Sequence, residues 1–329
     1  MENIIVTGGF GFIGLNLLSF LTNKKKYFVH NIDNLSLGHT YFDNFITKEQ
    51  KKLIQNHNLD INEKTKIKKI LEQHDIRKVY HLAAESHVDR SISGPTQFFK
   101  SNVMGTLNLV EACKDYINTN DIFNFKFLHV STDEVFGDLT EKQEPFNEKT
   151  PYKPSSPYSA SKAASDFIIK SWFRTFGFPA IVTNCSNNFG PCQNLEKLIP
   201  MSISKLLKRE KMGIYGNGQN IRDWLFVEDH VKSLYIIMNK GIIGESYCIG
   251  GNTEYSNINL FKKIHYLIEN YFKHKILPLN ESFVFVNDRL GHDFRYSINT
   301  EKIRKEFQIE HKTEIDIFLK KTIEFYISN

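Results

Sequence analysis

A tyrosine and a lysine four residues apart could carry acid–base chemistry in this 329-residue sequence. Tyr158 and Lys162 lie in a segment with helical spacing, and residues four apart share one face of a helix. A lysine ammonium near the phenol favours the phenolate and lowers the tyrosine pKa, which makes Tyr158 a usable base near neutral pH. A surface Tyr/Lys pair without a catalytic role has the same spacing, so the assignment depends on the rest of the chain.

Thr132, Asp133 and Glu134 form a second polar group, at the end of the β-rich segment 125–131. Open α/β sheets bind their ligands beyond the carboxyl ends of their strands. Two close carboxyl groups can serve as an acid and a base, because like charges push their pKa values apart. The position and the residue types therefore indicate a site of proton transfer.

A glycine-rich turn follows the first β-rich segment and precedes a helical pattern. Gly8, Gly11 and Gly14 permit a tight turn and a close approach of the backbone to a pyrophosphate, which the helix N-terminus attracts. Asp33 ends the next strand pattern, about 20 residues after Gly14, where a carboxylate can accept both ribose hydroxyls of NAD and repel the 2′-phosphate of NADP. A glycine loop that binds nothing is the alternative, but the strand–turn–helix context favours an NAD site.

Alternating strand and helix patterns must position these groups. The strand patterns cover 3–7, 27–32, 78–83, 125–131 and 181–184, and the helical patterns cover 11–21, 63–74, 97–116 and 158–176. This alternation predicts an α/β protein with a Rossmann-type parallel sheet and helices on both faces. Irregular Asn-, Gly- and Pro-rich stretches after residue 184 indicate a smaller, mixed α/β substrate-binding domain.

We expect two domains, because the chain exceeds the ~250–300 residues at which one core stops growing. Residues 1–183 should form the NAD-binding domain, together with a returning segment near 222–245. Residues 184–221 and 246–329 should form the substrate-binding domain. No flexible linker separates the two parts, so the site should lie between them.

Charge and composition exclude several classes of protein. The net charge of +5 comes from 42 basic and 37 acidic residues that are spread along the chain, so we expect no nucleic-acid partner. Polar residues interrupt every apolar run well before ~20 residues, and no signal peptide is recognisable, so we expect no membrane association. The four cysteines form no C-x-x-C pair, so we expect no metal site and reduced thiols in a cytoplasmic protein.

Seven further motifs extend the pattern over nearly the whole chain. They are HLAAESHVDRS at 81–91, STDEV at 131–135, SPYSASKA at 156–163, TNCSNN at 183–188, EKLIP at 196–200, RDWL at 222–225 and DRLGHD at 288–293. With these motifs the sequence resembles the extended short-chain dehydrogenase/reductase family and, within it, the dTDP-glucose 4,6-dehydratases. The resemblance implies an NAD-dependent hydro-lyase of deoxysugar biosynthesis, such as that of rhamnose, which converts a nucleoside-diphosphate-glucose to the 4-keto-6-deoxy sugar nucleotide.

The resemblance also implies roles for individual residues. Thr132 would hold the sugar 4-hydroxyl with Tyr158, Glu134 would remove the C5 proton, and Asp133 would protonate the departing C6 hydroxyl. The cofactor contacts of the family map onto Gly8, Gly11, Phe12, Ile13, Gly14, Asp33, Asn34, Ser36, Asp60, Ile61, Leu82, Ala83, Ala84, Ser86, Ser101, Tyr158, Lys162 and Asn188. The nucleotide-sugar contacts map onto Ser86, Thr132, Asn187, Glu196, Lys197, Leu198, Arg222, Asn257, Arg289, His292 and Tyr296.

Three alternatives remain at this point. A UDP-glucose 4,6-dehydratase would use the same chemistry on another nucleotide. A related epimerase or decarboxylase also needs Tyr158 and Lys162, but elimination of water requires an acid and a base, which Asp133 and Glu134 provide. A non-enzymatic NAD-binding protein would be expected to lose the Tyr/Lys pair or the basic residues that hold a diphosphate, and this sequence keeps both.

The helical patterns at 103–116 and 160–176 carry apolar residues beyond one buried stripe. Ile168, Ile169, Trp172 and Phe173 are examples. In the families that this chain resembles, the matching helices pair into a four-helix bundle, which implies a homodimer. The alternative is that both helices only cover the sheet.

Overall fold

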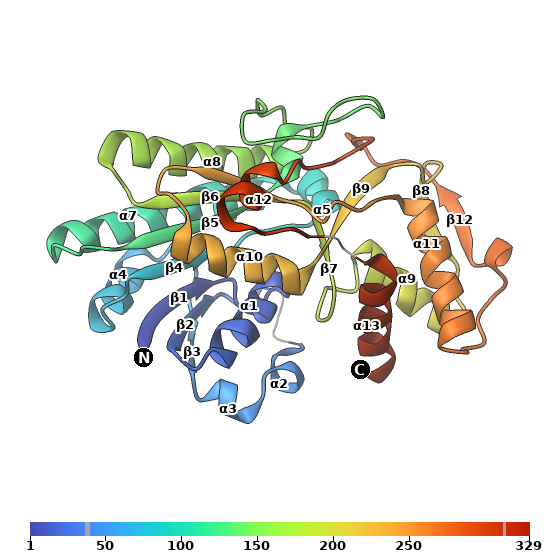
Figure 1. Cartoon of the computed structure of the whole chain (residues 1–329), viewed down its shortest axis with the longest axis horizontal. Helices are drawn as coiled ribbons and strands as arrows, with labels where there is room; N and C mark the ends of the chain where they lie inside the picture. Colours follow the sequence, from blue (N-terminus) through green and yellow to red (C-terminus); the bar gives the residue numbers. More distant parts are fainter. Residues whose placement is uncertain (37–39, 312–313) are drawn as a thin grey trace.

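A seven-stranded parallel sheet forms the frame of the molecule (Figure 1). The computed structural model describes residues 1–36, 40–311 and 314–329. The strands run in the order β10-β6-β5-β4-β1-β2-β3, so the order reverses between β1 and β4. Their bounds are β1 Glu2–Thr7, β2 Tyr27–Asp33, β3 Ile54–Asn58, β4 Lys78–His81, β5 Lys126–Thr132, β6 Ala180–Cys185 and β10 Ser246–Ile249. The predicted Rossmann-type sheet is confirmed.

Helices cover both faces of this sheet because its central strands are apolar on both sides. Ile4, Ile5 and Val6 of β1 are fully buried, as is typical of a parallel sheet with two covered faces. The helices α1 (Phe12–Asn23) and α10 (Val227–Lys240) pack together on one face. The helices α4 (Lys64–Gln73), α7 (Gly105–Thr119) and α8 (Pro157–Phe176) cover the other face (Figure 1).

Helix α8 has clear sequence signals at both ends. Ser156 and Ser159 form a reciprocal capping box at its N-terminus, and Pro157 occupies the first turn. Gly177 ends the helix with a φ of 66°, which favours glycine. The capping box and Pro157 fix the start of the helix just before Tyr158. The first turns of α8 therefore project from the carboxyl edge of the sheet.

A second group of elements lies beyond the carboxyl edge of the sheet (Figure 1). It contains a three-stranded sheet in the order β11-β9-β7 and a two-stranded sheet of β12 and β8. These strands are β7 Asn187–Phe189, β8 Met212–Tyr215, β9 Ile221–Phe226, β11 Glu254–Ser256 and β12 Phe283–Val286. The helices α9 (Leu198–Leu207), α11 (Asn257–Tyr266) and α13 (Ile315–Ser328) share a separate core that includes Phe226, Phe261 and Leu319.

Short helices complete the connections. They are α2 Phe42–Phe45, α3 Lys48–Lys51, α5 Val88–Ser93, α6 Pro95–Phe98, α12 Glu301–Phe307, the 3₁₀ turns η2 Asp133–Phe136 and η4 Leu279–Glu281, and the π-helical segments η1 Phe99–Met104 and η3 Leu267–Tyr271. The helix predicted over 97–116 is therefore α6, η1 and α7 in succession. Within the described residues, no helix combines the length and the apolarity needed to cross a membrane.

Two strands of the main sheet differ from the sequence-based expectation. No strand was predicted at β3, because only Ile54 of its residues is buried and the edge strand lacks an apolar alternation. Residues 246–329 were expected to lie in the second domain, but residues 246–249 form β10 and pair in parallel with β6. Conversely, the segment near 222–245 was expected to return to the NAD-binding domain, but β9 in this segment belongs to the three-stranded sheet.

Candidate active site

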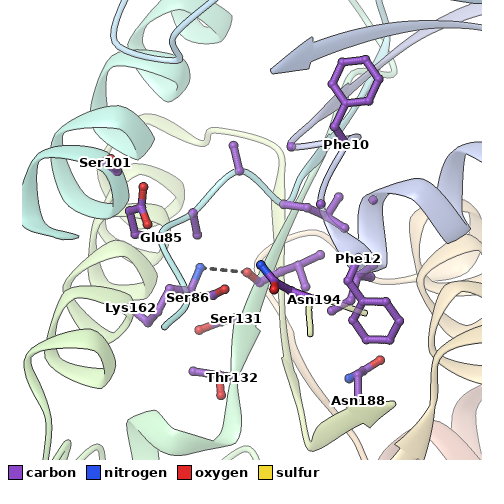
Figure 2. Close-up of a pocket in the computed structure, with 18 of the residues that line it drawn as sticks. Phe10, Phe12, Glu85, Ser86, Ser101, Ser131, Thr132, Lys162, Asn188 and Asn194 are labelled. Carbon is purple, nitrogen blue, oxygen red and sulfur yellow. Dashed lines mark hydrogen bonds between the residues drawn. The ribbon is translucent and has the colours of Figure 1, made fainter. Parts of the chain in front are cut away.

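One cavity of about 300 Å³ lies at the carboxyl ends of β1, β4 and β5, next to the point where the strand order reverses. Its walls come from the glycine-rich turn, from the ends of these strands, from the start of α8 and from the loop before α9. All 18 residues that the family resemblance assigned to the cofactor line this cavity. Figure 2 shows part of the lining, with Phe12, Ser101 and Asn188 of this set labelled. The cavity therefore brings together the glycine turn and the Tyr158–Lys162 pair, which are about 150 residues apart in the sequence.

The glycine-rich turn packs against the end of β4 too closely for side chains. A Cβ on Gly8, whose φ is +72°, would lie 2.7 Å from the backbone of Ala83. A Cβ on Gly14 would lie 2.1 Å from the carbonyl oxygen of Gly8. No side chain caps the N-terminus of α1 at Gly11, so its backbone N–H groups are available for a diphosphate. These features fit the pyrophosphate of a dinucleotide such as NAD.

Asp33 is held at the end of β2 by two backbone groups. The N–H of Phe10 donates to one carboxylate oxygen at 3.0 Å and the N–H of Leu35 donates to the other at 2.9 Å. Burial raises the pKa of Asp33, while the two backbone hydrogen bonds oppose that shift. The carboxylate lies in the wall of the cavity, where it can accept hydrogen bonds from a ribose.

The groups with catalytic potential meet at the other end of the cavity. Thr132 is the last residue of β5, and Asp133 and Glu134 follow it in the turn η2. The Thr132 hydroxyl lies 3.2 Å from a carboxyl oxygen of Asp133, and it accepts a hydrogen bond from the Glu134 N–H at 3.3 Å. Lys162 donates from Nζ to the carbonyl oxygen of Val130 at 2.9 Å (Figure 2).

The two carboxyl groups have different electrostatic surroundings. Burial raises the pKa of Asp133 well above its ordinary value, and the negative charge of Glu134 raises it further. Burial also raises the pKa of Glu134, but the nearby cations Arg289, Arg222 and Lys197 oppose that shift. Asp133 is therefore the better proton donor of the pair and Glu134 the better acceptor.

The structure does not show the expected lowering of the Tyr158 pKa. Burial raises the pKa of Tyr158 well above its ordinary value, and the charge of Glu134 adds to this. A hydrogen bond with Thr132 acts in the opposite direction but is smaller. The expectation was wrong because it counted the charge of Lys162 and not the desolvation of the phenol.

The predicted nucleotide-sugar residues divide into two groups. Ser86, Thr132, Asn187, Glu196 and Lys197 line the cavity. Lys197 donates to the Ser86 carbonyl at 2.9 Å, and Glu196 forms an ion pair with Arg90. The remaining six residues lie outside the lining in the described part of the chain; they are Leu198, Arg222, Asn257, Arg289, His292 and Tyr296.

Three residues of this outer group lie near enough to Glu134 to interact with its charge. Arg222 and Arg289 lower the pKa of Glu134, and Glu134 contributes to the raised pKa of Tyr296. The guanidinium of Arg222 also lies 4.3 Å from the ring centroid of Tyr296. His292 is hydrogen-bonded to Asp288 at 2.6 Å. Asn257 begins α11, where its N–H donates to the Asn220 carbonyl.

Several residues that line the cavity had no predicted role. Phe10, Ser131, Cys185, Ser186, Gln193 and Asn194 are polar or bulky examples. Phe10 lies inside the glycine motif and Ser131 precedes Thr132, so their neighbours in the sequence were a usable signal. Cys185 ends β6 inside the TNCSNN motif, but that motif assigned it no role. No pattern in the sequence marks Gln193, which reaches the cavity through the loop before α9.

Comparison with known proteins places the chain in a family. The family model described as GDP-mannose 4,6 dehydratase matches residues 5–322. The chain belongs to this family. A dTDP-glucose 4,6-dehydratase from Haemophilus influenzae is 44% identical to it, with 100% of this chain and 99% of the relative covered. A dTDP-glucose 4,6-dehydratase from Escherichia coli K12 is 42% identical, with 99% and 93% covered. The resemblance inferred from the motifs is confirmed.

Solved structures of this 4,6-dehydratase family share the fold. A dTDP-glucose 4,6-dehydratase from Bacillus anthracis, solved with NAD, superposes with a TM-score of 0.87 at 35% identity and covers 100% of this chain and 97% of its own. The enzyme from Streptomyces venezuelae, also with NAD, has a TM-score of 0.89 at 31% identity and covers 100% and 98%. A UDP-glucose 4-epimerase from Thermotoga maritima reaches 0.84 at 26% identity and covers 99% of each chain, so the fold alone does not select the reaction.

Proposed function

We propose that this protein is an NAD-dependent dTDP-glucose 4,6-dehydratase, a hydro-lyase that forms the 4-keto-6-deoxy sugar nucleotide. The observation that carries the proposal is the placement of Thr132, Asp133 and Glu134 in one cavity with Tyr158 and Lys162. The pair on α8 serves oxidation at C4, and the two carboxyl groups serve elimination of water. The names of the relatives at 44% and 42% identity support this reading.

The chain's own groups then divide the proton transfers. NAD, when bound, supplies a reversible two-electron acceptor for C4 and later a donor for C6. Tyr158 accepts the proton of the C4 hydroxyl, which Thr132 orients. Burial of the phenol opposes its ionisation, so Tyr158 requires a nearby positive charge at this step, and Lys162 on the next turn of α8 carries one.

Elimination follows from the acidity of C5 next to the 4-ketone. Glu134 removes the C5 proton and Asp133 gives a proton to the departing C6 hydroxyl, so one water molecule leaves. The raised pKa of Asp133 keeps that carboxyl protonated for this transfer. Reprotonation of C5 completes the reaction, and the sugar nucleotide leaves with a 4-ketone and a C6 methyl group.

The diphosphate of the substrate requires cations at the mouth of the site. Lys197 lines the cavity, and Arg222 and Arg289 act on the charge of Glu134 in it. Guanidinium groups suit the bidentate recognition of phosphate oxygens. The other predicted contacts, Leu198, Asn257, His292 and Tyr296, belong to the same proposal. UDP-glucose is the second candidate substrate, because these cations recognise the diphosphate and not the base.

Product analysis tests this function. The purified protein is incubated with dTDP-glucose and, separately, with UDP-glucose, and the products are examined for a 4-keto-6-deoxy sugar by NMR. We expect the product from dTDP-glucose. Formation of a 4-epimer without loss of water would support the epimerase alternative. Absence of any turnover with bound NAD would support a non-enzymatic protein.

We also propose the cellular and quaternary setting. The protein is cytoplasmic, associates with neither membrane nor nucleic acid, and forms a homodimer through α7 and α8. The apolar side chains exposed on η1 and α8 support the dimer; they are Phe99 at 42%, Met104 at 47%, Phe167 at 57%, Phe173 at 38% and Phe176 at 53%. Ile169, which the sequence analysis placed in this surface, is instead buried against the sheet.

Two domains complete the proposal. The NAD-binding domain comprises residues 1–183 and a later segment of the chain that returns to it. This returning segment was expected near 222–245; it contains α10 and also β10, which adds a strand to the main sheet. The substrate-binding domain comprises residues 184–221 and most of 246–329. The separate apolar core around α9, α11 and α13 supports this division.

A further inference from the structure

A buried carboxylate lies one helical turn beyond Lys162, on the side of α8 that faces the sheet. Asp166 is fully buried, and it accepts three hydrogen bonds, two from the strands β5 and β6 and one from the loop before α8. His129 of β5 contacts one carboxylate oxygen at 3.1 Å. The Tyr152 hydroxyl at 2.8 Å and the Asn184 amide at 3.1 Å contact the other oxygen. No step of the proposed reaction uses this residue.

The surroundings of Asp166 favour its ionised form. Burial alone would raise its pKa, but the hydrogen bond from His129, the charges of protonated His129 and of Lys162, and the hydrogen bond from Tyr152 bring it below the ordinary value. Burial lowers the pKa of His129 to about 4, so this imidazole is neutral at pH 7 and donates through Nε2. Asp166 therefore carries a negative charge that His129 does not neutralise.

Lys162 needs such a charge. Its side chain is 4% exposed, and within the described residues its one side-chain hydrogen bond goes to the neutral Val130 carbonyl. Burial lowers the pKa of Lys162, and the charge of Asp166 opposes that shift. A buried ammonium is unstable without a counter-charge. Asp133 cannot supply one, because burial raises its pKa well above the ordinary value.

We propose that Asp166 is a positioning residue for the reaction, because its buried carboxylate is the counter-charge that keeps Lys162 as an ammonium in the active site. The residues are four apart on α8, and this spacing places them on one helix face. The inference deepens the proposed function, because Lys162 acts in that function only as a cation. Asp166 does not line the cavity, so it acts through Lys162 and not on the substrate.

The network continues from Asp166 toward the outside of α8. Lys170 donates to the Tyr152 hydroxyl at 2.9 Å, and this lysine is partly exposed. The other titratable groups that act on Lys162, Tyr158 or Asp166 come from β4, β5, β6 and η2; they are His81, His129, Asp133, Glu134 and Cys185. Of these, His81 and His129 are neutral because burial lowers their pKa values. Among these groups, Asp166 is therefore the negative charge that faces Lys162 on the side of α8 toward the sheet.

Asp166→Asn removes the charge while keeping the hydrogen-bonding partners. The amide oxygen can accept from Tyr152 and Asn184, as the carboxylate does. The amide N–H₂ would face Nε2 of His129, whose Nδ1 has no partner among the described residues and can take the proton instead. Asp166→Glu is the variant that restores the charge. Tyr152→Phe is the matched control, because it removes one hydrogen bond to the Asp166 carboxylate but leaves the negative charge of that carboxylate in place.

The first measurement is the pKa of Lys162 in the NAD-loaded protein without substrate. The ε-carbon of Lys162 is followed by ¹³C NMR in labelled protein and identified by its absence in Lys162→Met. We expect Asp166→Asn to lower this pKa by about 1–3 units, the usual effect of an opposite charge within ~4–6 Å. Tyr152→Phe should lower it much less, and Asp166→Glu should restore most of the shift. An unchanged pKa in Asp166→Asn overturns the proposal.

The second measurement is the pH dependence of the reaction with dTDP-glucose. Asp166→Asn should move the alkaline limb of kcat to lower pH by the same amount, because loss of the ammonium then occurs at lower pH. If Tyr152→Phe moves the alkaline limb of kcat by the same amount, the effect comes from packing and the proposal is contradicted. If Asp166→Asn and Asp166→Ser both fail to bind NAD, Asp166 serves folding and the proposal is wrong. A parent enzyme without turnover contradicts the proposed function alone, since the NMR result does not depend on it.

Discussion

Asp133 and Glu134 are neighbours in the sequence but meet different charges, and this difference is the main feature of the site at the scale of residues. Asp133 is fully buried beside another carboxyl group. Glu134 is less buried and faces three cations from the second part of the molecule. One acid and one base thus arise from two similar side chains.

Removing the two carboxyl groups should separate oxidation from elimination. In Asp133→Asn/Glu134→Gln, the shapes remain but proton transfer at C5 and C6 is lost, which costs about 10²–10⁴-fold in rate for each group. We expect reduced nicotinamide to accumulate after addition of dTDP-glucose in a single-turnover absorbance experiment. Tyr158→Phe, which lacks the base for the first step, should show none. Dehydration by the double variant at the parent rate would exclude these residues as acid and base.

Asp33 should select NAD over NADP. Its carboxylate lies in the cavity wall, fixed by the backbone N–H groups of Phe10 and Leu35. Asp33→Ala should weaken NAD binding by about 1.5–3 kcal/mol, the scale of a hydrogen bond to a charged group, and should weaken NADP binding less. Calorimetric titration of the cofactor-free protein measures both affinities, with Asp43→Ala as the control outside the cavity. Tighter binding of NADP than of NAD by the parent protein would refute this.

At the scale of elements, the glycine turn and α1 determine whether the cofactor can approach. The methyl group of Gly14→Ala would lie 2.1 Å from the Gly8 carbonyl oxygen, so the turn must open. We expect NAD affinity to fall by at least ~10-fold, because the backbone donors of α1 then lose their alignment. Gly94→Ala is the control, since its Cβ would lie 3.7 Å from its nearest neighbour. Equal NAD affinity in both variants would contradict this role of the turn.

The sequence predicts a helix or strand correctly where a single clear pattern covers it. Strands such as β1 and helices such as α8 follow from uninterrupted apolar runs and from capping residues. The edge strand β3 could not be predicted, because its side chains are mostly exposed and it is held by pairing with β2. The strand β10 is four residues long and lies among irregular segments, so only its neighbour β6 identifies it.

The residues of the candidate site also divide into those with a clear sequence pattern and those without one. The glycine turn, Asp33 and the Tyr158–Lys162 pair have motifs of their own. Arg222 and Arg289 lie in the RDWL and DRLGHD motifs, but spacing alone does not show that they and Tyr296 approach Glu134 from distant parts of the chain. Asp166 was also missed, because an acidic residue in the middle of a helix usually lies at the surface. Its burial is visible only when β5 and β6 are packed against α8.

At the scale of the whole molecule, buried histidines make the stability depend on pH. Burial lowers the pKa of His30 to about 4, and the nearby His74 and His57 add to this. The unfolded chain binds this proton below about pH 6.5, but the folded chain binds it only below about pH 4. The free energy of unfolding should therefore fall as the pH decreases through this interval, by on the order of 3 kcal/mol for His30 alone.

Denaturant titration at several pH values checks this dependence. His30→Gln should show a shallower decrease than the parent between pH ~6.5 and ~4, because one proton fewer is taken up on unfolding. Identical slopes in the two proteins would show that His30 is not held neutral.

The exposed phenylalanines of α8 make quaternary structure the second prediction at this scale. Phe167 is 57% exposed on the outer side of the helix. Light scattering of the parent should give twice the mass of one chain at micromolar concentration, and Phe167→Asp should lower the measured mass toward that of a monomer. Leu290→Asp, at a side chain 76% exposed outside α7 and α8, is the control and should leave the mass unchanged. A monomeric parent would rule out the proposed dimer.

The late return of β10 to the sheet has a consequence for how the protein is made. Until residues 246–249 emerge from the ribosome, the outer edge of β6 exposes its unpaired backbone groups, although all six residues of β6 are buried in the finished molecule. Such an open apolar edge readily pairs with other chains. The NAD-binding sheet is therefore completed only after the first segment of the second part, residues 184–221, has been synthesised. A nascent chain arrested before residue 246 would be a target for chaperones, however complete its glycine turn and its catalytic helix are.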